Sequence, residues 1–157
     1  MYREDWIIRL IRQFAEALAR MAGLRKAGDF RQALEAADRL YDELGIPRDL
    51  VDVVDTPTLA GMLRRPDKIR AAAILLWEEG HIFKAKGDPL TAFAKYRRAH
   101  ELFLEARAQD PQPEDDSAIL ELSRVVPARV PPGHATVTST SGESAGIVIG
   151  TVIVLLS

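Results

Sequence analysis

Apolar residues recur along the first 126 positions at the spacing of amphipathic helices. Between residues 3 and 26 they follow one another at intervals of four and three, which places them on one stripe of a helix. The periodicity returns over residues 30–44, 67–86, 89–109 and 114–126. The pattern predicts four long helices and a shorter fifth. The defining residues are Ile7, Ile11, Phe14, Leu18 and Met21; then Phe30, Ala33, Leu34, Ala37, Leu40, Tyr41 and Leu44; Ile69, Ala73, Leu76, Trp77, Ile82 and Phe83; Phe93, Tyr96, Ala99, Leu102, Phe103 and Ala106; and Ile119, Leu120, Leu122 and Val125.

The stretch between the second and third long helices, residues 48–67, lacks a sustained period. Thr56-Pro57 has the chemistry of an N-cap followed by proline in the first helical turn, which predicts a two-turn helix. Residues 50–54 are apolar at four of five positions and fit either another short helix or an apolar connector.

Two matched turns separate the long helices. Gly28-Asp29 divides the first pair and Gly87-Asp88, 59 residues further on, divides the second. Glycine readily adopts the left-handed backbone that ends a helix, and an aspartate side chain can cap the next one. Because both breaks are short, each pair should form an antiparallel hairpin. The expected fold is all-α, a compact bundle of helical hairpins.

The composition changes after residue 126. Prolines and then Ser, Thr and Gly dominate, which divides the chain into a helical domain at 1–126 and a tail at 127–157. The apolar segment Ala145–Leu156 would make only about 18 Å of helix, against about 30 Å of bilayer hydrocarbon. Its β-branched residues favour a strand. Three interpretations stay open for the tail: an irregular segment, strand pairing within or between chains, and membrane contact, which is the least favoured.

Composition and charge exclude several classes of function. A net charge of −2 over 157 residues argues against a dedicated nucleic-acid binder, which needs basic excess to offset phosphates. The absence of cysteine excludes disulfides, thiolate metal sites and cysteine nucleophiles. Acidic residues precede the first apolar run, unlike a secretory signal, so we expect a cytoplasmic protein.

The second hairpin resembles a tetratricopeptide repeat. With Gly87-Asp88 at the turn between its helices, the small and aromatic packing positions of that motif fall on Gly80, Phe83, Ala92, Tyr96 and Ala99. The first hairpin is similar at Met21, Leu24, Ala33, Ala37 and Leu40. Residues 1–124 together resemble a small bacterial family of unknown function with tetratricopeptide-like helices, a resemblance that implies the fold and no activity. The 59-residue separation differs from the usual period near 34, so the chain is not a regular solenoid.

The resemblance also implies a candidate peptide groove, because the first helix of each tetratricopeptide repeat lines a concave surface. The corresponding positions are Leu18, Arg25, Lys26, Trp77, His81 and Lys84. Basic groups above an apolar floor would suit an acidic peptide or a C-terminal carboxylate. In the alternative, which the irregular spacing favours, the two hairpins share no groove and Trp77 belongs to the core.

No residue stands out as catalytic, and none as a cofactor or metal ligand. His81, His100 and a glutamate could in principle form a metal site, but helix residues without a special role are the simpler interpretation. Adjacent carboxylates such as Glu78-Glu79 and Asp115-Asp116 diverge on a helix, so we expect them on the solvated surface.

The leading hypothesis is therefore a non-enzymatic module for protein interaction or self-assembly. Its partner would be a protein or peptide, including a second copy of the chain, with no nucleic acid and no cofactor. The first alternative is a small-ligand-binding protein or enzyme with a pocket between the hairpins. The second is peripheral membrane association through the C-terminal segment.

Overall fold

A computed structural model describes the backbone of residues 2–126 and the side chains from residue 12 onward. Every regular element in this part of the chain is a helix. The long helices are α1 (Tyr2–Lys26), α2 (Phe30–Glu43), α5 (Pro66–Lys86) and α6 (Pro89–Gln109), with short α3 (Arg48–Val51) and α4 (Thr56–Leu63) between α2 and α5, and α7 (Pro113–Val125) at the end. The all-α prediction is confirmed; the predicted tail at 127–157 lies outside the described residues.

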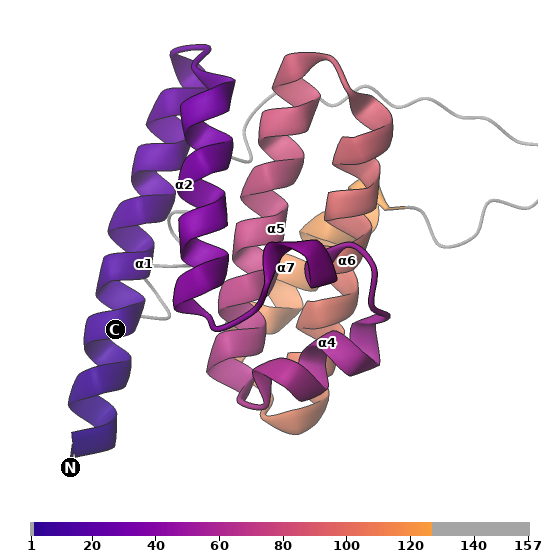
Figure 1. Cartoon of the computed structure of the whole chain (residues 1–157). Coiled ribbons are helices and arrows are strands. Elements are labelled where there is room, and N and C mark those ends of the chain that lie inside the picture. Colours follow the sequence, from indigo (N-terminus) through magenta and orange to yellow (C-terminus); the bar gives the residue numbers. More distant parts are fainter. Residues whose placement is uncertain (1, 127–157) are drawn as a thin grey trace, which may run out of the picture.

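The long helices form two antiparallel hairpins, α1–α2 and α5–α6, that lie side by side (Figure 1). Gly28 and Gly87 both have positive φ, and Asp29 and Asp88 accept hydrogen bonds from the backbone amides of Gln32 and Thr91. Each turn therefore ends one helix in the left-handed conformation and caps the next, as expected from the Gly-Asp pairs.

Helix α5 is the centre of the bundle. It packs against α1 and α2 on one side and most extensively against α6 on the other, while α4 closes one end (Figure 1). Every residue from Ala72 to Gly80 is buried, as expected of a helix that is covered all round. The largest fully buried side chains come from five helices and one connector: Trp77, Tyr41, Phe103, Met21, Leu40, Ile46, Leu59, Ile69, Leu75, Leu76, Ile82 and Leu102.

Close approach of α5 and α6 depends on Gly80. A Cβ atom at this position would lie 2.4 Å from Cε1 and 2.6 Å from Cδ1 of Tyr96, far inside van der Waals contact. The Tyr96 ring therefore occupies the space that any side chain at position 80 would fill. The missing side chain at position 80 thus lets α5 and α6 approach closely at this level of the hairpin.

Helix α7 packs on α6 and is also tied to α5 by a buried ion pair. The Arg70 guanidinium donates through Nε and Nη2 to the two carboxylate oxygens of Asp115, at 2.7 and 2.8 Å. Asp115 is buried and Asp116 is exposed. The prediction that both carboxylates are solvated is wrong for Asp115, because its counter-charge lies 45 residues away in the sequence.

The helical pattern also misplaces Phe93. We expected it on the inner face of its helix, but 41% of its surface is exposed. Ala92, Lys95 and Tyr96 are the buried residues around it, so the inner face of α6 is rotated away from Phe93.

Candidate functional site

The candidate groove residues separate into two groups. Leu18 and Trp77 are buried in the core, where Trp77 packs edge-on against Phe103 with 6.1 Å between ring centroids. Lys26 and Lys84 are exposed, while Arg25 and His81 are partly buried and have internal partners. The basic side chains are thus near the surface, but the apolar floor that the groove requires is inside the protein.

Arg25 joins the two hairpins through a buried carboxylate. Its Nε donates to Oε1 of Glu78 at 2.8 Å. Burial raises the pKa of Glu78, and the hydrogen bond and positive charge of Arg25 oppose this rise. The pair links α1 to α5, so Arg25 has a structural role whether or not a ligand binds nearby.

His81 faces α6 and forms a hydrogen bond with Tyr96. Its Nδ1 lies 2.8 Å from the Tyr96 hydroxyl. Burial is the main reason that the pKa of His81 falls to about 4, and the positive charges of Arg25 and Lys84 lower it further. His81 is therefore neutral near pH 7. In the described part of the chain, no three His, Asp or Glu side chains gather as metal ligands would.

The most buried charge in this part of the protein is Glu79. Its Oε1 accepts a hydrogen bond from the Tyr41 hydroxyl, and its Oε2 accepts one from Arg48 Nη2 at 2.8 Å and lies 3.5 Å from Lys95 Nζ. Burial raises the pKa of Glu79, while Lys95 and Arg48 act against this. Burial together with the Glu79 charge also holds the pKa of Tyr41 well above its usual range. We call these four residues the Glu79 cluster.

Both members of the Glu78-Glu79 pair are buried, so the prediction of a solvated pair is wrong. They do diverge, as adjacent helix residues must, but α5 is covered all round and each carboxylate meets a different neighbour. The apolar run from Ala71 to Trp77 was the sequence signal for a central helix. This run could have indicated that the carboxylates directly after it are buried and need cationic partners. It could not have identified those partners as Arg25 and Arg48.

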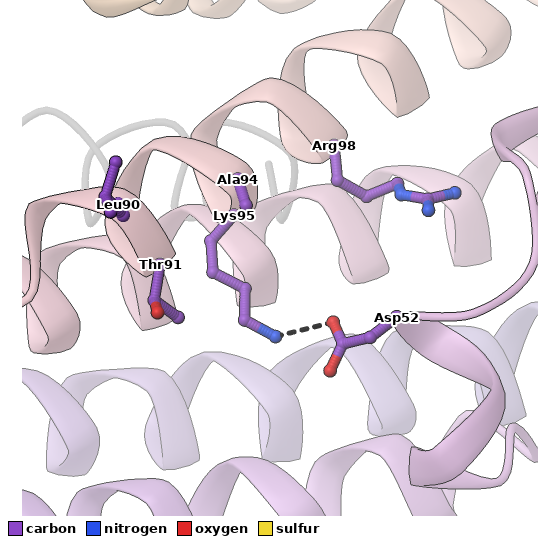
Figure 2. Close-up of a pocket in the computed structure, with 6 residues that line it drawn as sticks. All are labelled: Asp52, Leu90, Thr91, Ala94, Lys95 and Arg98. Atoms are coloured by element: carbon purple, nitrogen blue, oxygen red, sulfur yellow. Dashed lines mark hydrogen bonds and ion pairs between the residues drawn. The ribbon is translucent and has the colours of Figure 1, made fainter.

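An open pocket of about 370 Å³ lies between α6 and the connector that follows α3. Figure 2 shows its six lining residues: Asp52, Leu90, Thr91, Ala94, Lys95 and Arg98. Lys95 points across the pocket floor to Asp52, with 2.7 Å between Nζ and Oδ1. Lys95 also belongs to the Glu79 cluster. Its ammonium group therefore interacts both with Asp52 in the pocket and with the buried Glu79 carboxylate.

The wall of this pocket continues into an exposed apolar surface on α6. Leu90 is 84% exposed, and Phe93 lies one turn further along the helix. Ala94 is exposed as well and lies one turn along α6 from Leu90 (Figure 2). We call Leu90, Phe93 and Ala94, with Arg97 and Arg98 that follow them, the α6 face. The sequence did not point to this face, because Phe93 fitted the buried stripe and the other residues carried no motif.

Comparison of the chain with models of known protein families, with curated proteins and with solved structures finds no match. The tetratricopeptide resemblance and the bacterial family therefore stay predictions. Among the described residues, no helix combines the length and apolar character needed to cross a bilayer. The cytoplasmic location likewise stays a prediction.

Proposed function

We propose that the protein is a non-enzymatic interaction module that binds a partner protein through the α6 face. The observation that carries this proposal is Leu90, a large apolar side chain that is 84% exposed in the wall of an open pocket. Phe93 and Ala94 are also exposed, and they follow Leu90 at the three- and four-residue spacings that place side chains next to one another on a helix. Surfaces of this kind, bordered by polar residues, are typical of sites where proteins dock.

The enzyme alternative receives less support from the same pocket. Each of its polar side chains already has a partner: Lys95 binds Asp52, Thr91 binds the capping residue Asp88, and Arg98 donates to Thr56. The neutral His81 faces Tyr96, and His81 does not line the pocket. These pairings support the interaction module over the enzyme alternative.

The hairpin α5–α6 suits a tetratricopeptide-like role as a rigid support. The close approach of Gly80 to Tyr96 fixes the two helices against each other, which is consistent with the expected packing positions. The docking surface that we propose lies on the second helix of the hairpin. It differs from the groove expected on the first helices, where the burial of Leu18 and Trp77 argues against an apolar floor.

Photo-crosslinking from position 94 tests the proposal. Ala94 lines the pocket and is exposed, so a benzoylphenylalanine in its place would report on whatever covers Leu90. In a lysate of the cells that make the protein, we expect one cross-linked protein whose yield falls about tenfold or more in Leu90→Asp, since anchor residues of interfaces contribute about 2 kcal/mol or more.

Leu120→Asp is the matched control. Leu120 on α7 is also exposed, at 58%, but does not line the pocket, so its replacement should leave the cross-link unchanged. Loss of the cross-link in both variants, or no cross-linked protein at all, would refute the proposal. A product of two copies of the chain would assign the α6 face to self-assembly instead.

A further inference from the structure

The junction between α4 and α5 contains a strained backbone turn. Arg64 has a φ of 68° and a ψ of −48°, and in the part of the chain that the structure describes no other residue except glycine has a positive φ. The amide of Arg65 donates to the carbonyl of Leu63 at 2.8 Å. This hydrogen bond and these angles define a γ-turn of the positive-φ type, which is rare and strained for a residue with a side chain.

The proline that begins α5 explains why the chain takes this turn. Pro66 disfavours the helical conformation for the residue before it, and Arg65 is extended at φ −99° and ψ 137°. Helix α4 must therefore end before Arg65, while α5 begins directly after it. The chain changes direction within two residues, and Arg64 takes a conformation that glycine would adopt with less strain.

Helix α4 is also weak by its own sequence. It has eight residues, whereas an isolated helix needs about 12–15 to be even marginally stable in water. Thr56, Thr58 and Gly61 are poor helix formers. Among the described residues, no neighbouring atom lies within 4 Å of the place that a Cβ on Gly61 would take, so packing does not require this glycine. The helix therefore depends on its contacts with the rest of the bundle.

Those contacts anchor the start of α4 to α6. Asp55 caps the first turn and is attracted by the charge of Arg98. The Thr56 hydroxyl donates to Glu101 and accepts a hydrogen bond from Arg98 at 3.3 Å. Arg98 also lines the pocket, so α4 begins directly beside it. The opposite end of the helix is the strained turn.

We propose that α4 is a lid over one end of the α5–α6 hairpin, which opens by local unfolding while both hairpins stay folded (Figure 1). The strained turn and the weak helix lower the free energy of this opening below that of unfolding the whole protein. Opening exposes the buried face of α4, which carries Leu59, Ala60 and Leu63, and uncovers the surfaces of α5 and α6 beneath it. The pocket then extends into the end of the bundle. This lid does not depend on what binds the α6 face.

Hydrogen exchange of the full chain, resolved to single amides by NMR, measures the opening. The amides of Leu59 and Arg64 donate to the carbonyls of Asp55 and Ala60, at the two ends of α4. Relative to the intrinsic rates, we expect α4 amides to exchange at least about a hundredfold faster than the most protected amides of α5 and α6.

A core variant separates local opening from global unfolding. Ile82 is fully buried and lies about 24 Å along α5 from its first residue. Ile82→Val should accelerate exchange of the most protected α5 and α6 amides about threefold, because it lowers the stability of the whole protein. It should leave exchange in α4 unchanged, since the core stays folded when the lid opens.

Two substitutions of Arg64 test the role of the strained turn. Arg64→Gly should slow exchange in α4 about fivefold, because glycine adopts a positive φ with little strain. Arg64→Ala is the matched control, since it keeps the strain and removes only an exposed side chain, and exchange should not change. Gly61→Ala should slow exchange in α4 about fourfold through its higher helix propensity.

Two results would overturn the proposal. If Ile82→Val accelerated exchange in α4 as much as in α5 and α6, the lid would open only when the whole protein unfolds. If Arg64→Gly and Arg64→Ala exchanged at equal rates in α4, the strained turn would not promote the opening.

Discussion

Glu79 is the residue at which the two hairpins and their connector meet. One carboxylate holds the Tyr41 hydroxyl of α2, Arg48 of α3 and the Lys95 ammonium of α6. Desolvating a carboxylate is costly, and its partners offset that cost only while all of them are present. The stability of the bundle should therefore depend more on this residue than on any exposed ion pair.

We expect Glu79→Gln to lower the free energy of unfolding by about 3–5 kcal/mol, because breaking a buried ion pair leaves charges without compensation. Glu35→Gln is the matched control. Glu35 pairs with Arg31 on the surface of α2, where such a pair contributes at most about 1 kcal/mol. Urea denaturation of both variants measures the difference, and equal losses would contradict the role given to Glu79.

Gly80 leads to a second prediction at the residue scale. Alanine has the higher helix propensity by about 1 kcal/mol, yet Gly80→Ala should destabilise the protein by about 1–3 kcal/mol through overpacking against Tyr96. Gly23→Ala in α1 has open space around it and should be neutral or stabilising. Thermal unfolding of the two variants checks the sign of each effect, and stabilisation by both would show that the ring of Tyr96 moves aside.

At the scale of elements, the turn between α5 and α6 depends on one backbone conformation. Gly87 has a φ of 86°, and its amide donates to the carbonyls at the end of α5. We expect Gly87→Ala to cost about 1–2 kcal/mol, since an L residue is strained in this region. Gly87→Asn should cost less, because asparagine tolerates the left-handed region better. Chemical denaturation measures the stability of both variants. A lower stability of Gly87→Asn than of Gly87→Ala would contradict this explanation.

The helices were largely predictable from sequence, because their signals are local. Apolar periodicity located the five longest, and Gly-Asp pairs and prolines marked their ends to within one or two residues. The side chains that join helices were not predictable in this way. Glu79 reaches Arg48 across 31 residues, and nothing in the local pattern around either residue indicates the other.

The α6 face was missed for a related reason. Periodicity shows which residues can share a stripe, but the packing of neighbouring helices decides which stripe is buried. On α6 the buried stripe passes through Ala92 and Tyr96, and Phe93 lies at its edge. The candidate groove rested on a resemblance, which likewise does not show which side of a helix its neighbours cover. Leu18 and Trp77 lie in the core for this reason.

At the scale of the whole molecule, pH should affect stability through His81. Its pKa in the folded protein is about 4, below the ordinary value of 6.5. As pH falls below 6.5 the unfolded chain takes up a proton that the folded protein does not, so this residue makes stability fall by at most about 1.4 kcal/mol per pH unit until about pH 4.

Comparison of the unmodified protein with His81→Gln isolates this effect. Glu78 and Glu79 have raised pKa values and act in the opposite sense, because their folded forms take up protons more readily than the unfolded chain. The variant keeps both carboxylates. As pH falls from about 6.5 to about 4, its free energy of unfolding should therefore decrease less than that of the unmodified protein. If the free energies of unfolding of the two proteins changed equally with pH, His81 would take up its proton over the same pH range in the folded protein as in the unfolded chain.

The connector between the hairpins has a consequence for how such a chain could evolve. Repeat proteins lengthen by tandem duplication, because each new unit needs only the surface of its neighbour. Here the second hairpin contains Glu79, and the matching Arg48 comes from the irregular segment before it. A duplicated hairpin without that segment would bring a buried carboxylate that lacks one of its cations. The architecture therefore favours a closed, two-hairpin unit over an extendable array.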